Sequence, residues 1–313
     1  MSAQSDWPDI PYPAWKDSCA TLQLWAQIVG KVRLAASPWL NHGWQVPLYV
    51  SARGLATGPV YFGARIAELE FDFIVHQLVL RTGEGAVRHI LLTPRSVADF
   101  HAELMGALEG LGLTVRIVGT PNEVADPIPF ARDEIHCSYD PDAAHRFWRA
   151  LVQVDRVLKR FRTGFLGKAS PVHFFWGSFD LAVTRFSGRP APLHPGGVPG
   201  LPDAVTREAY SHEVSSAGFW PGGGPIDYPA FYSYAYPAPE GFSDARVHPA
   251  EARFAADLGE FLLPYDAVRN AADPDAALMA FLQSTYDAAA DLGGWDRGAL
   301  ECGLGRPGVV RVV

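Results

Sequence analysis

Residues able to carry acid–base chemistry gather in two short segments of the second half of the chain. Residues 170–189 read SPVHFFWGSFDLAVTRFSGR, and residues 211–213 read Ser-His-Glu. Histidine is the usual proton carrier near neutral pH, and carboxylates act as general acids or bases when their surroundings shift the pKa. The predicted catalytic residues are His173, Asp180, His212 and Glu213.

The same residues lack the spacing of a common metal site. There is no His-Glu-x-x-His motif, and His212 and Glu213 are adjacent, so they would point to opposite faces of a strand. The cysteines Cys19, Cys137 and Cys302 are few, odd in number and far apart, which supports neither disulfides nor a thiolate zinc site. We therefore predict no metal ligand and name no cofactor. The alternative to a catalytic role is that these four polar side chains are satisfied by buried hydrogen bonds.

The segment around Asp180 suits the wall of a pocket. If residues 173–186 form one regular strand, alternate side chains point to opposite faces. One face would then be apolar, with Phe175, Phe179, Leu181 and Val183, and the other would carry Trp176, Ser178, Asp180 and Thr184. An aromatic ring beside hydroxyls and a carboxylate is typical of a small-molecule site. A bulge at Gly177 would change this register.

Two arginines and a second tryptophan complete the predicted site. Arg185 and Arg189 flank the end of this strand, beside a Pro- and Gly-rich loop at 188–203 whose length favours a functional role. A guanidinium group can hold a carboxylate or phosphate through paired hydrogen bonds, although an ion pair within the protein is an equal alternative. The predicted substrate-binding residues are Trp176, Ser178, Arg185, Arg189 and Trp220.

Composition limits the partners of the chain. With 313 residues, of which 48% are hydrophobic, the chain can bury a large core and has room for about two domains. The net charge of −8 is spread along the chain, which argues against nucleic acid as a partner. No apolar run of about 18 residues and no secretory signal occur, so we expect a cytoplasmic protein without membrane contact. No feature specifies an oligomeric state.

An internal similarity indicates how these segments are positioned. Residues 140–144 read Asp-Pro-Asp-Ala-Ala and recur letter for letter at 273–277, a spacing of 133. The same spacing relates Trp15 to Trp148, and it relates Ala-Ser-Pro at 36–38 to the same letters at 169–171. A chance match occurs at about one position in twenty, so these runs favour an internal duplication.

The duplication predicts the domain organisation. We expect a first unit at 8–140, a second unit carrying the site at 141–273, a C-terminal helix at 274–300 that repeats the first helix of the unit, and a tail at 301–313. The fold class is α+β, with two homologous halves related by approximate two-fold symmetry, each a mainly antiparallel sheet with packed helices.

Local patterns predict the individual elements. Apolar residues at spacings of three and four indicate amphipathic helices at 15–29 and 147–161. Further helices are predicted at 96–111, 249–258 and 274–292. Strands are predicted at 46–53, 70–81, 87–92, 114–118, 173–186, 213–220 and 230–236.

Several of these segments resemble a known family. Residues 15–34, 167–181, 184–189 and 212–222, above all the HFFWGSFDL sequence, are similar to a bacterial domain-of-unknown-function family numbered 5996. The resemblance extends over nearly the whole chain and implies a bacterial cytoplasmic protein. The family has no assigned activity, so the resemblance implies no catalytic role for any residue.

These observations support an enzyme that acts on a small anionic, partly apolar molecule in a cleft between the two halves. One carboxylate, Asp180 or Glu213, would exchange a proton with the substrate, and a histidine would assist. The alternative is a non-catalytic binding or sensing protein that uses the same pocket. A third interpretation is an interaction protein whose aromatic run at 220–236 packs against a partner. An enzyme requires at least two titratable groups that face one cavity, whereas a binder needs a single polar anchor.

Overall fold

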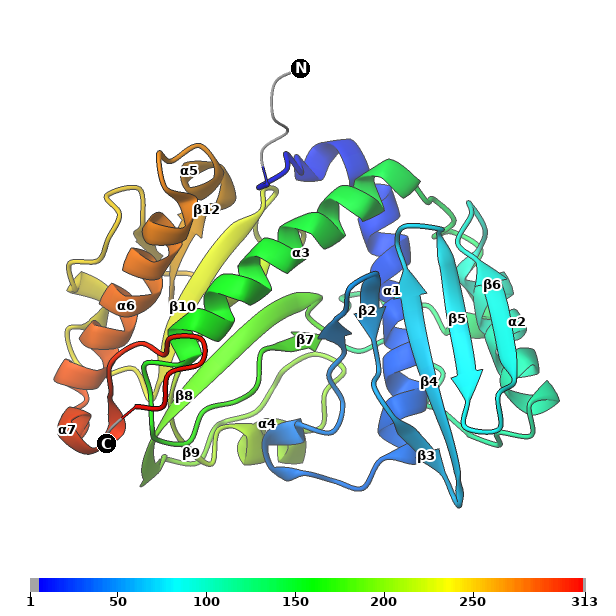
Figure 1. The fold of residues 1–313 in the computed structure, drawn as a ribbon, viewed down its shortest axis with the longest axis horizontal. Helices are drawn as coiled ribbons and strands as arrows, with labels where there is room; N and C mark the ends of the chain where they lie inside the picture. Colours follow the sequence, from blue (N-terminus) through cyan, green and yellow to red (C-terminus); the bar gives the residue numbers. More distant parts are fainter. Residues whose placement is uncertain (1–5, 312–313) are drawn as a thin grey trace.

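The chain folds into two antiparallel β-sheets with helices packed on them, and a single hydrophobic core runs through both parts (Figure 1). The computed structural model describes residues 6–311. The predicted α+β class, with antiparallel sheets and a C-terminal helix, is confirmed.

The first sheet has the strand order β1-β2-β4-β5-β6, with β3 also paired to β4. Its strands are β1 (Tyr49–Val50), β2 (Gly54–Ala56), β3 (Val60–Phe62), β4 (Arg65–Asp72), β5 (Gln77–Thr82) and β6 (Val87–Leu91). Residues 70–81, predicted as one strand, instead turn between β4 and β5. The Asp72 side chain accepts hydrogen bonds from the backbone N–H groups of Ile74 and Val75, which stabilises this turn.

The second sheet has the strand order β11-β12-β10-β9-β8-β7. Its strands are β7 (His173–Phe175), β8 (Asp180–Pro190), β9 (His212–Trp220), β10 (Ala230–Tyr236), β11 (Arg253–Ala255) and β12 (Glu260–Pro264). The predicted single strand at 173–186 is a hairpin, because the chain reverses between Phe175 and Asp180 with Phe179 in the left-handed region (φ 62°).

Four long helices form where the patterns predict them. They are α1 (Tyr12–Ala36), α2 (Val97–Gly110), α3 (Pro141–Arg162) and α6 (Pro274–Leu292); the short helices are α4 (Asp203–Ala209), α5 (Tyr265–Arg269) and α7 (Arg297–Leu300). The repeated Asp-Pro-Asp-Ala-Ala sequence is a helix start. Asp140 and Asp273 accept hydrogen bonds from the backbone N–H groups of Ala143 and Ala276, and a proline follows each cap.

Two predicted elements are wrong. Residues 114–118, predicted as a strand, join no sheet, and residues 249–258, predicted as a helix, instead contain β11. The two Ala-Ser-Pro sequences also occupy different places. Residues 36–38 lie at the end of α1, whereas residues 169–171 follow the end of α3 by several residues, and there the Ser170 N–H donates to the Thr184 carbonyl.

The two sheets meet at their edges. Leu48 and Phe174 exchange two backbone hydrogen bonds of 2.9 Å, which brings the start of β1 beside β7. In Figure 1 helices α3 and α6 cover the front of the second sheet, while α1 and α2 lie behind the first sheet. Helices α3 and α6 therefore leave the back of the second sheet uncovered. Within residues 6–311, none of the helices has the length and apolar character needed to span a membrane.

Candidate functional site

A cavity of about 710 Å³ lies on the face of the second sheet that α3 and α6 do not cover; we call it the aromatic cavity. Along β8, Leu181 and Arg185 point toward the helices, whereas Asp180 and Thr184 line the cavity. Its roof comes from the end of α1, from residues 118–123 and from residues 198–210. The lining aromatic residues are Trp39, Trp44, Phe175, Trp176, Phe186, Tyr210, Trp220, Tyr232 and Tyr234. Both halves of the sequence thus contribute to one cavity.

Asp180 is the buried carboxylate on the floor of the cavity. Ser178 Oγ donates a hydrogen bond of 2.5 Å to Asp180 Oδ1, and the Tyr232 hydroxyl donates to Oδ2. Tyr232 can cross the intervening strand β9 because residue 218 is glycine, and a β-carbon there would overlap the Tyr232 hydroxyl. Burial raises the pKa of Asp180, while the two hydrogen bonds oppose this shift.

Two further carboxyl groups line the same cavity. Glu260 begins β12, and Glu123 lies in the roof with its backbone in the left-handed region (φ 57°). Both line the cavity, where Glu260 is half-buried and Glu123 is exposed, and neither carboxyl group makes a hydrogen bond or ion pair with another residue in the range 6–311. Burial, and after it the charge of Asp180, raise the pKa of each to about 7. Both groups can therefore gain or lose a proton near neutral pH.

Hydroxyl groups connect the rest of the floor. Thr184 Oγ1 and Ser216 Oγ lie 2.9 Å apart across β8 and β9, and the hydroxyls of Tyr210 and Tyr234 are also 2.9 Å apart. Burial raises the pKa of Tyr234 well above its ordinary value, so these tyrosines are neutral hydrogen-bonding groups.

One lysine lines the cavity and holds part of the roof. Lys31 of α1 donates to the side-chain oxygen of Asn122, and Gln27 makes hydrogen bonds of 2.8 Å with the backbone N–H and C=O of Asn122. The Glu123 N–H donates to the Pro199 carbonyl at 3.1 Å, which ties the two roof segments together. Burial lowers the pKa of Lys31 to about 8.

A basic pair lies at the other end of the cavity. Lys168 Nζ donates to His42 Nε2 at 2.5 Å, and His42 Nδ1 lies 3.1 Å from the Ala209 carbonyl. Burial and the charge of Lys168 lower the pKa of His42, so the ring is the neutral tautomer that accepts from Lys168 and donates to the carbonyl.

The predicted site residues separate into two groups. Trp176, Ser178, Asp180 and Trp220 line the aromatic cavity, and so does Phe175, which the predicted alternation placed on the opposite face. His173 is fully buried behind Trp44 and Phe175, with ring centroids 5.9 and 5.5 Å away, and neither ring nitrogen has a hydrogen-bond partner. Burial, with the charges of nearby arginines, lowers the pKa of His173 to about 3. His173 is thus a neutral core residue.

His212 and Glu213 lie outside the cavity lining. The His212 ring is 6.0 Å from that of His42, and its Nδ1 lies 3.0 Å from Ser211 Oγ. Glu213 accepts from Arg189 at 2.7 Å and from Ser187 at 2.8 Å. Glu213 is therefore engaged in an ion pair on the outer part of the sheet.

Neither predicted arginine lines the cavity. Arg185 is buried between α3 and α6, where its guanidinium lies 3.5 Å from the Phe161 ring centroid and 4.4 Å from that of Tyr286. Arg189 pairs with Glu213 and donates to carbonyls that follow α6, at Gly293 and Gly294. The lining residues given by the described part of the chain include no arginine.

Sequence reasoning missed Glu123, Glu260 and Lys31. Glu123 lies in a segment without periodicity, and Lys31 lies on a helix whose apolar stripe suggested only core. Glu260 begins a short strand, Glu260–Pro264, that is otherwise apolar; an acidic residue next to such a strand was the one available signal.

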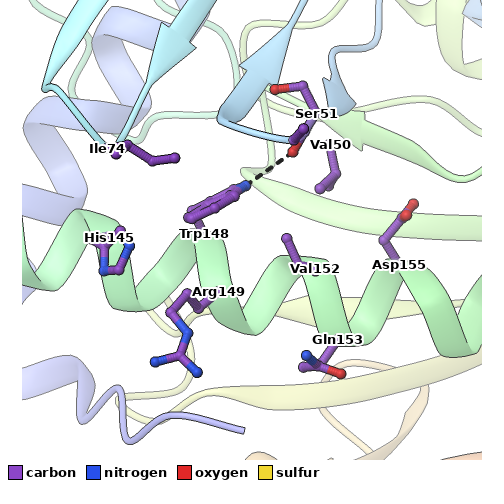
Figure 2. Close-up of a pocket in the computed structure, with 10 residues that line it drawn as sticks. Val50, Ser51, Ile74, His145, Trp148, Arg149, Val152, Gln153 and Asp155 are labelled. Atoms are coloured by element: carbon purple, nitrogen blue, oxygen red, sulfur yellow. Dashed lines mark hydrogen bonds between the residues drawn. The ribbon is translucent and has the colours of Figure 1, made fainter. Parts of the chain in front are cut away.

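A second concavity of similar volume, about 710 Å³, lies between α3 and the β1–β2 turn; we call it the α3 groove (Figure 2). Trp148 donates its indole N–H to the Ser51 carbonyl at 3.2 Å, and Asp155 pairs with Lys159 at 2.6 Å. Its tryptophan and its acidic residue thus already have partners, unlike the free carboxyl groups of the aromatic cavity. Within residues 6–311, histidine, cysteine and acidic residues form no group of three arranged to hold a metal.

Comparison with known proteins identifies a family. The model of the family described as a family of unknown function (DUF5996) matches residues 7–302. No curated protein and no solved structure matches the chain.

Proposed function

The chain belongs to the family of unknown function DUF5996, and we propose that it is an enzyme that performs acid–base chemistry on a small, partly apolar molecule bound in the aromatic cavity. One observation carries this proposal: the carboxyl groups of Glu123 and Glu260, both without protein partners among the described residues, line the same cavity and have pKa values raised to about 7. Two titratable groups facing one cavity are the minimum that acid–base catalysis needs.

The roles follow from the environment of each group. With pKa values near 7, one glutamate can hold a proton while the other is ionised at neutral pH. The protonated group would give a proton to the substrate, and the ionised group would accept one. Asp180, held by Ser178 and Tyr232, is a positioning residue in this proposal, because its nearby charge contributes to both raised pKa values.

The cavity modifies the expected substrate. The arginines predicted to hold an anion, Arg185 and Arg189, lie elsewhere, so the proposal retains a partly apolar molecule but does not require an anionic one. Aromatic walls favour an apolar body on the substrate.

We further propose that the two halves, 8–140 and 141–273, arose by duplication and meet at the cavity. Each half begins with a long helix, α1 or α3, that is followed by the strands of one antiparallel sheet. The C-terminal helix would then repeat the start of the unit, and the proposed setting is the bacterial cytoplasm.

A non-catalytic binding protein is the second candidate. It is favoured by the state of Asp180, whose two oxygens already accept hydrogen bonds, as expected for a fixed polar anchor in an aromatic pocket. An interaction protein is disfavoured, since Phe231 and Tyr232 of the aromatic run are buried within the chain.

Turnover of a metabolite extract separates these candidates. The native protein is incubated with the extract, and compounds are followed by mass spectrometry. We expect one compound to be consumed, and Glu123→Gln and Glu260→Gln to lower the rate about a hundredfold or more. The matched control Glu213→Gln should react like wild type, because its ion pair lies outside the cavity. A compound that is retained but recovered unchanged would favour the binding protein, and wild-type turnover by both cavity variants would refute the assigned roles.

A further inference from the structure

We propose that the ligand of the aromatic cavity is a small organic cation with an apolar body, held by the carboxyl groups of Glu123 and Glu260. This inference deepens the proposed function, since it names the class of molecule that occupies the same cavity. It rests on the cavity being a ligand site and does not require that the ligand be turned over.

The carboxyl groups supply the first argument. Glu123 comes from the roof and Glu260 from β12, and both lie close enough to Asp180 on β8 to be influenced by its charge. No hydrogen bond or ion pair to the rest of residues 6–311 satisfies either carboxyl group, so their partner is whatever fills the cavity. An ionised carboxylate that is half-buried, as Glu260 is, gains from a positive partner, which an ammonium or related group would provide.

The walls supply the second argument. Indole and phenol rings attract cations over their faces, and the attraction strengthens where water is excluded. Trp176 lies against the α1 backbone at Gly30, and its indole N–H donates to the Val46 carbonyl at 2.9 Å. This ring is therefore fixed, and its orientation does not depend on a bound ligand.

Lysines of the protein lie against some of the aromatic walls, but none in the range 6–311 pairs with either glutamate. Lys31 is the lysine among the described lining residues, and Asn122 accepts a hydrogen bond from its ammonium group. Lys31 lies 5.7 Å from the Trp176 ring centroid and forms no ion pair with either glutamate. Lys168 is held by His42 at the opposite end. Lys168 Nζ lies 5.3 Å from the Trp44 ring centroid and 4.9 Å from that of Phe186. Among the described lining residues, the carboxyl groups of Asp180, Glu123 and Glu260 outnumber the ammonium group of Lys31, which forms no ion pair with any of them.

An independent observation also points to a ligand. Thr206 of α4 lines the cavity, is only 3% exposed, and its hydroxyl has no hydrogen-bond partner. Buried hydroxyl groups are nearly always satisfied, so this one is best explained by a polar group that a ligand brings. A ligand with a second hydrogen-bonding group besides its cation could satisfy this hydroxyl.

The proposal predicts the pH dependence of binding. The titratable and charged groups around the two glutamates are Asp180 of β8, Tyr232 and Tyr234 of β10, Tyr210 after α4, Lys31 of α1 and His42. Without ligand, the pKa of each glutamate is raised to about 7. A bound cation favours the ionised form, so binding releases protons, and affinity rises with pH through 7.

Three probes of matched shape test the inference on the full-length protein. They are phenethylammonium, which is cationic at both pH 6 and pH 8, its neutral analogue 2-phenylethanol, and its anionic analogue 3-phenylpropanoate. Calorimetry at the two pH values measures each affinity. We expect phenethylammonium to bind about tenfold more tightly at pH 8 than at pH 6. At pH 8 the alcohol should bind more weakly than the ammonium, and the carboxylate most weakly.

Variants assign the effect to the cavity. Glu260→Gln and Glu123→Gln should each lower the affinity for phenethylammonium about fivefold or more and reduce its pH dependence, while Glu213→Gln should behave like wild type. Circular dichroism reports whether each variant is folded, and the pH dependence of the wild type alone tests the inference if a variant is not.

The outcomes separate this inference from the proposed function. Cation recognition is overturned if 3-phenylpropanoate or 2-phenylethanol binds more tightly than the ammonium at pH 8, if the ammonium affinity does not change with pH, or if the ammonium does not bind. In each case acid–base catalysis is still judged by turnover. Predicted ammonium binding supports the inference even where the metabolite assay detects no turnover, in which case only the enzymatic proposal fails.

Discussion

At the scale of single residues, the cavity depends on which polar groups have protein partners. Asp180 accepts hydrogen bonds from two hydroxyl groups and is fixed, whereas Glu123 and Glu260 face the cavity without such partners. Residue type did not distinguish these groups beforehand. His173 belongs to the predicted catalytic set by type, yet it lies in the core with two unsatisfied ring nitrogens.

The burial of His173 predicts an effect of pH on stability. Its pKa is lowered to about 3, below the ordinary value of 6.5, so between these values the unfolded state binds more protons and stability falls as pH falls. His173 should therefore lower the free energy of unfolding by about 2 kcal/mol between pH 7 and pH 5. His173→Phe should remove this contribution, as urea unfolding at the two pH values would measure.

The change in unfolding free energy between pH 7 and pH 5 is compared between wild type and His173→Phe, because Glu123 and Glu260 change this free energy in the direction opposite to His173. Their raised pKa values mean that the folded state binds more protons below pH 7, which stabilises it on acidification. The wild type provides the control, since both glutamates contribute equally to its pH dependence and to that of His173→Phe. An identical response of His173→Phe and wild type would contradict the assignment of His173.

At the scale of elements, helix starts are the most predictable feature. Asp273 caps α6 through a hydrogen bond of 3.0 Å from the Ala276 N–H. Asp273→Ala should lower the free energy of unfolding by about 1 kcal/mol, whereas Asp273→Asn should preserve most of it, because asparagine also caps helices. Urea unfolding of both variants checks this, and equal losses would show that the cap contributes nothing specific.

The strands were less predictable because their limits depend on side-chain hydrogen bonds and on distant partners. The turn at residues 73–76 follows from Asp72 accepting local backbone hydrogen bonds, which a run of β-forming residues conceals. β11 at Arg253–Ala255 exists because β12 pairs with it, and local propensity at 249–258 suggested a helix instead. The predicted alternation holds only from Asp180 onward, where β8 places Asp180 and Thr184 on the cavity face; the hairpin turn also brings Phe175, predicted on the opposite face, to the cavity.

At the scale of the whole molecule, the site could be predicted only in part. Along β8, the alternation places Asp180 and Thr184 on the floor, whereas Trp176 and Ser178 reach it from the turn that precedes β8. The roof does not follow from the alternation, because Glu123 and Lys31 reach the cavity only when α1 and two irregular segments pack over the second sheet. No local pattern records that packing. The described residues that line the cavity come from both parts of the sequence, 31–123 and 175–260.

The titration of the side-chain carboxyl groups tests the central claim most directly. Carbon-detected NMR of protein labelled at glutamate carboxyl carbons follows each group between pH 4 and pH 9, and Glu123→Gln and Glu260→Gln assign the two signals. The account predicts that these two carboxyl groups titrate near pH 7, about two units above ordinary glutamates. Titration of every glutamate below about pH 5 would contradict it.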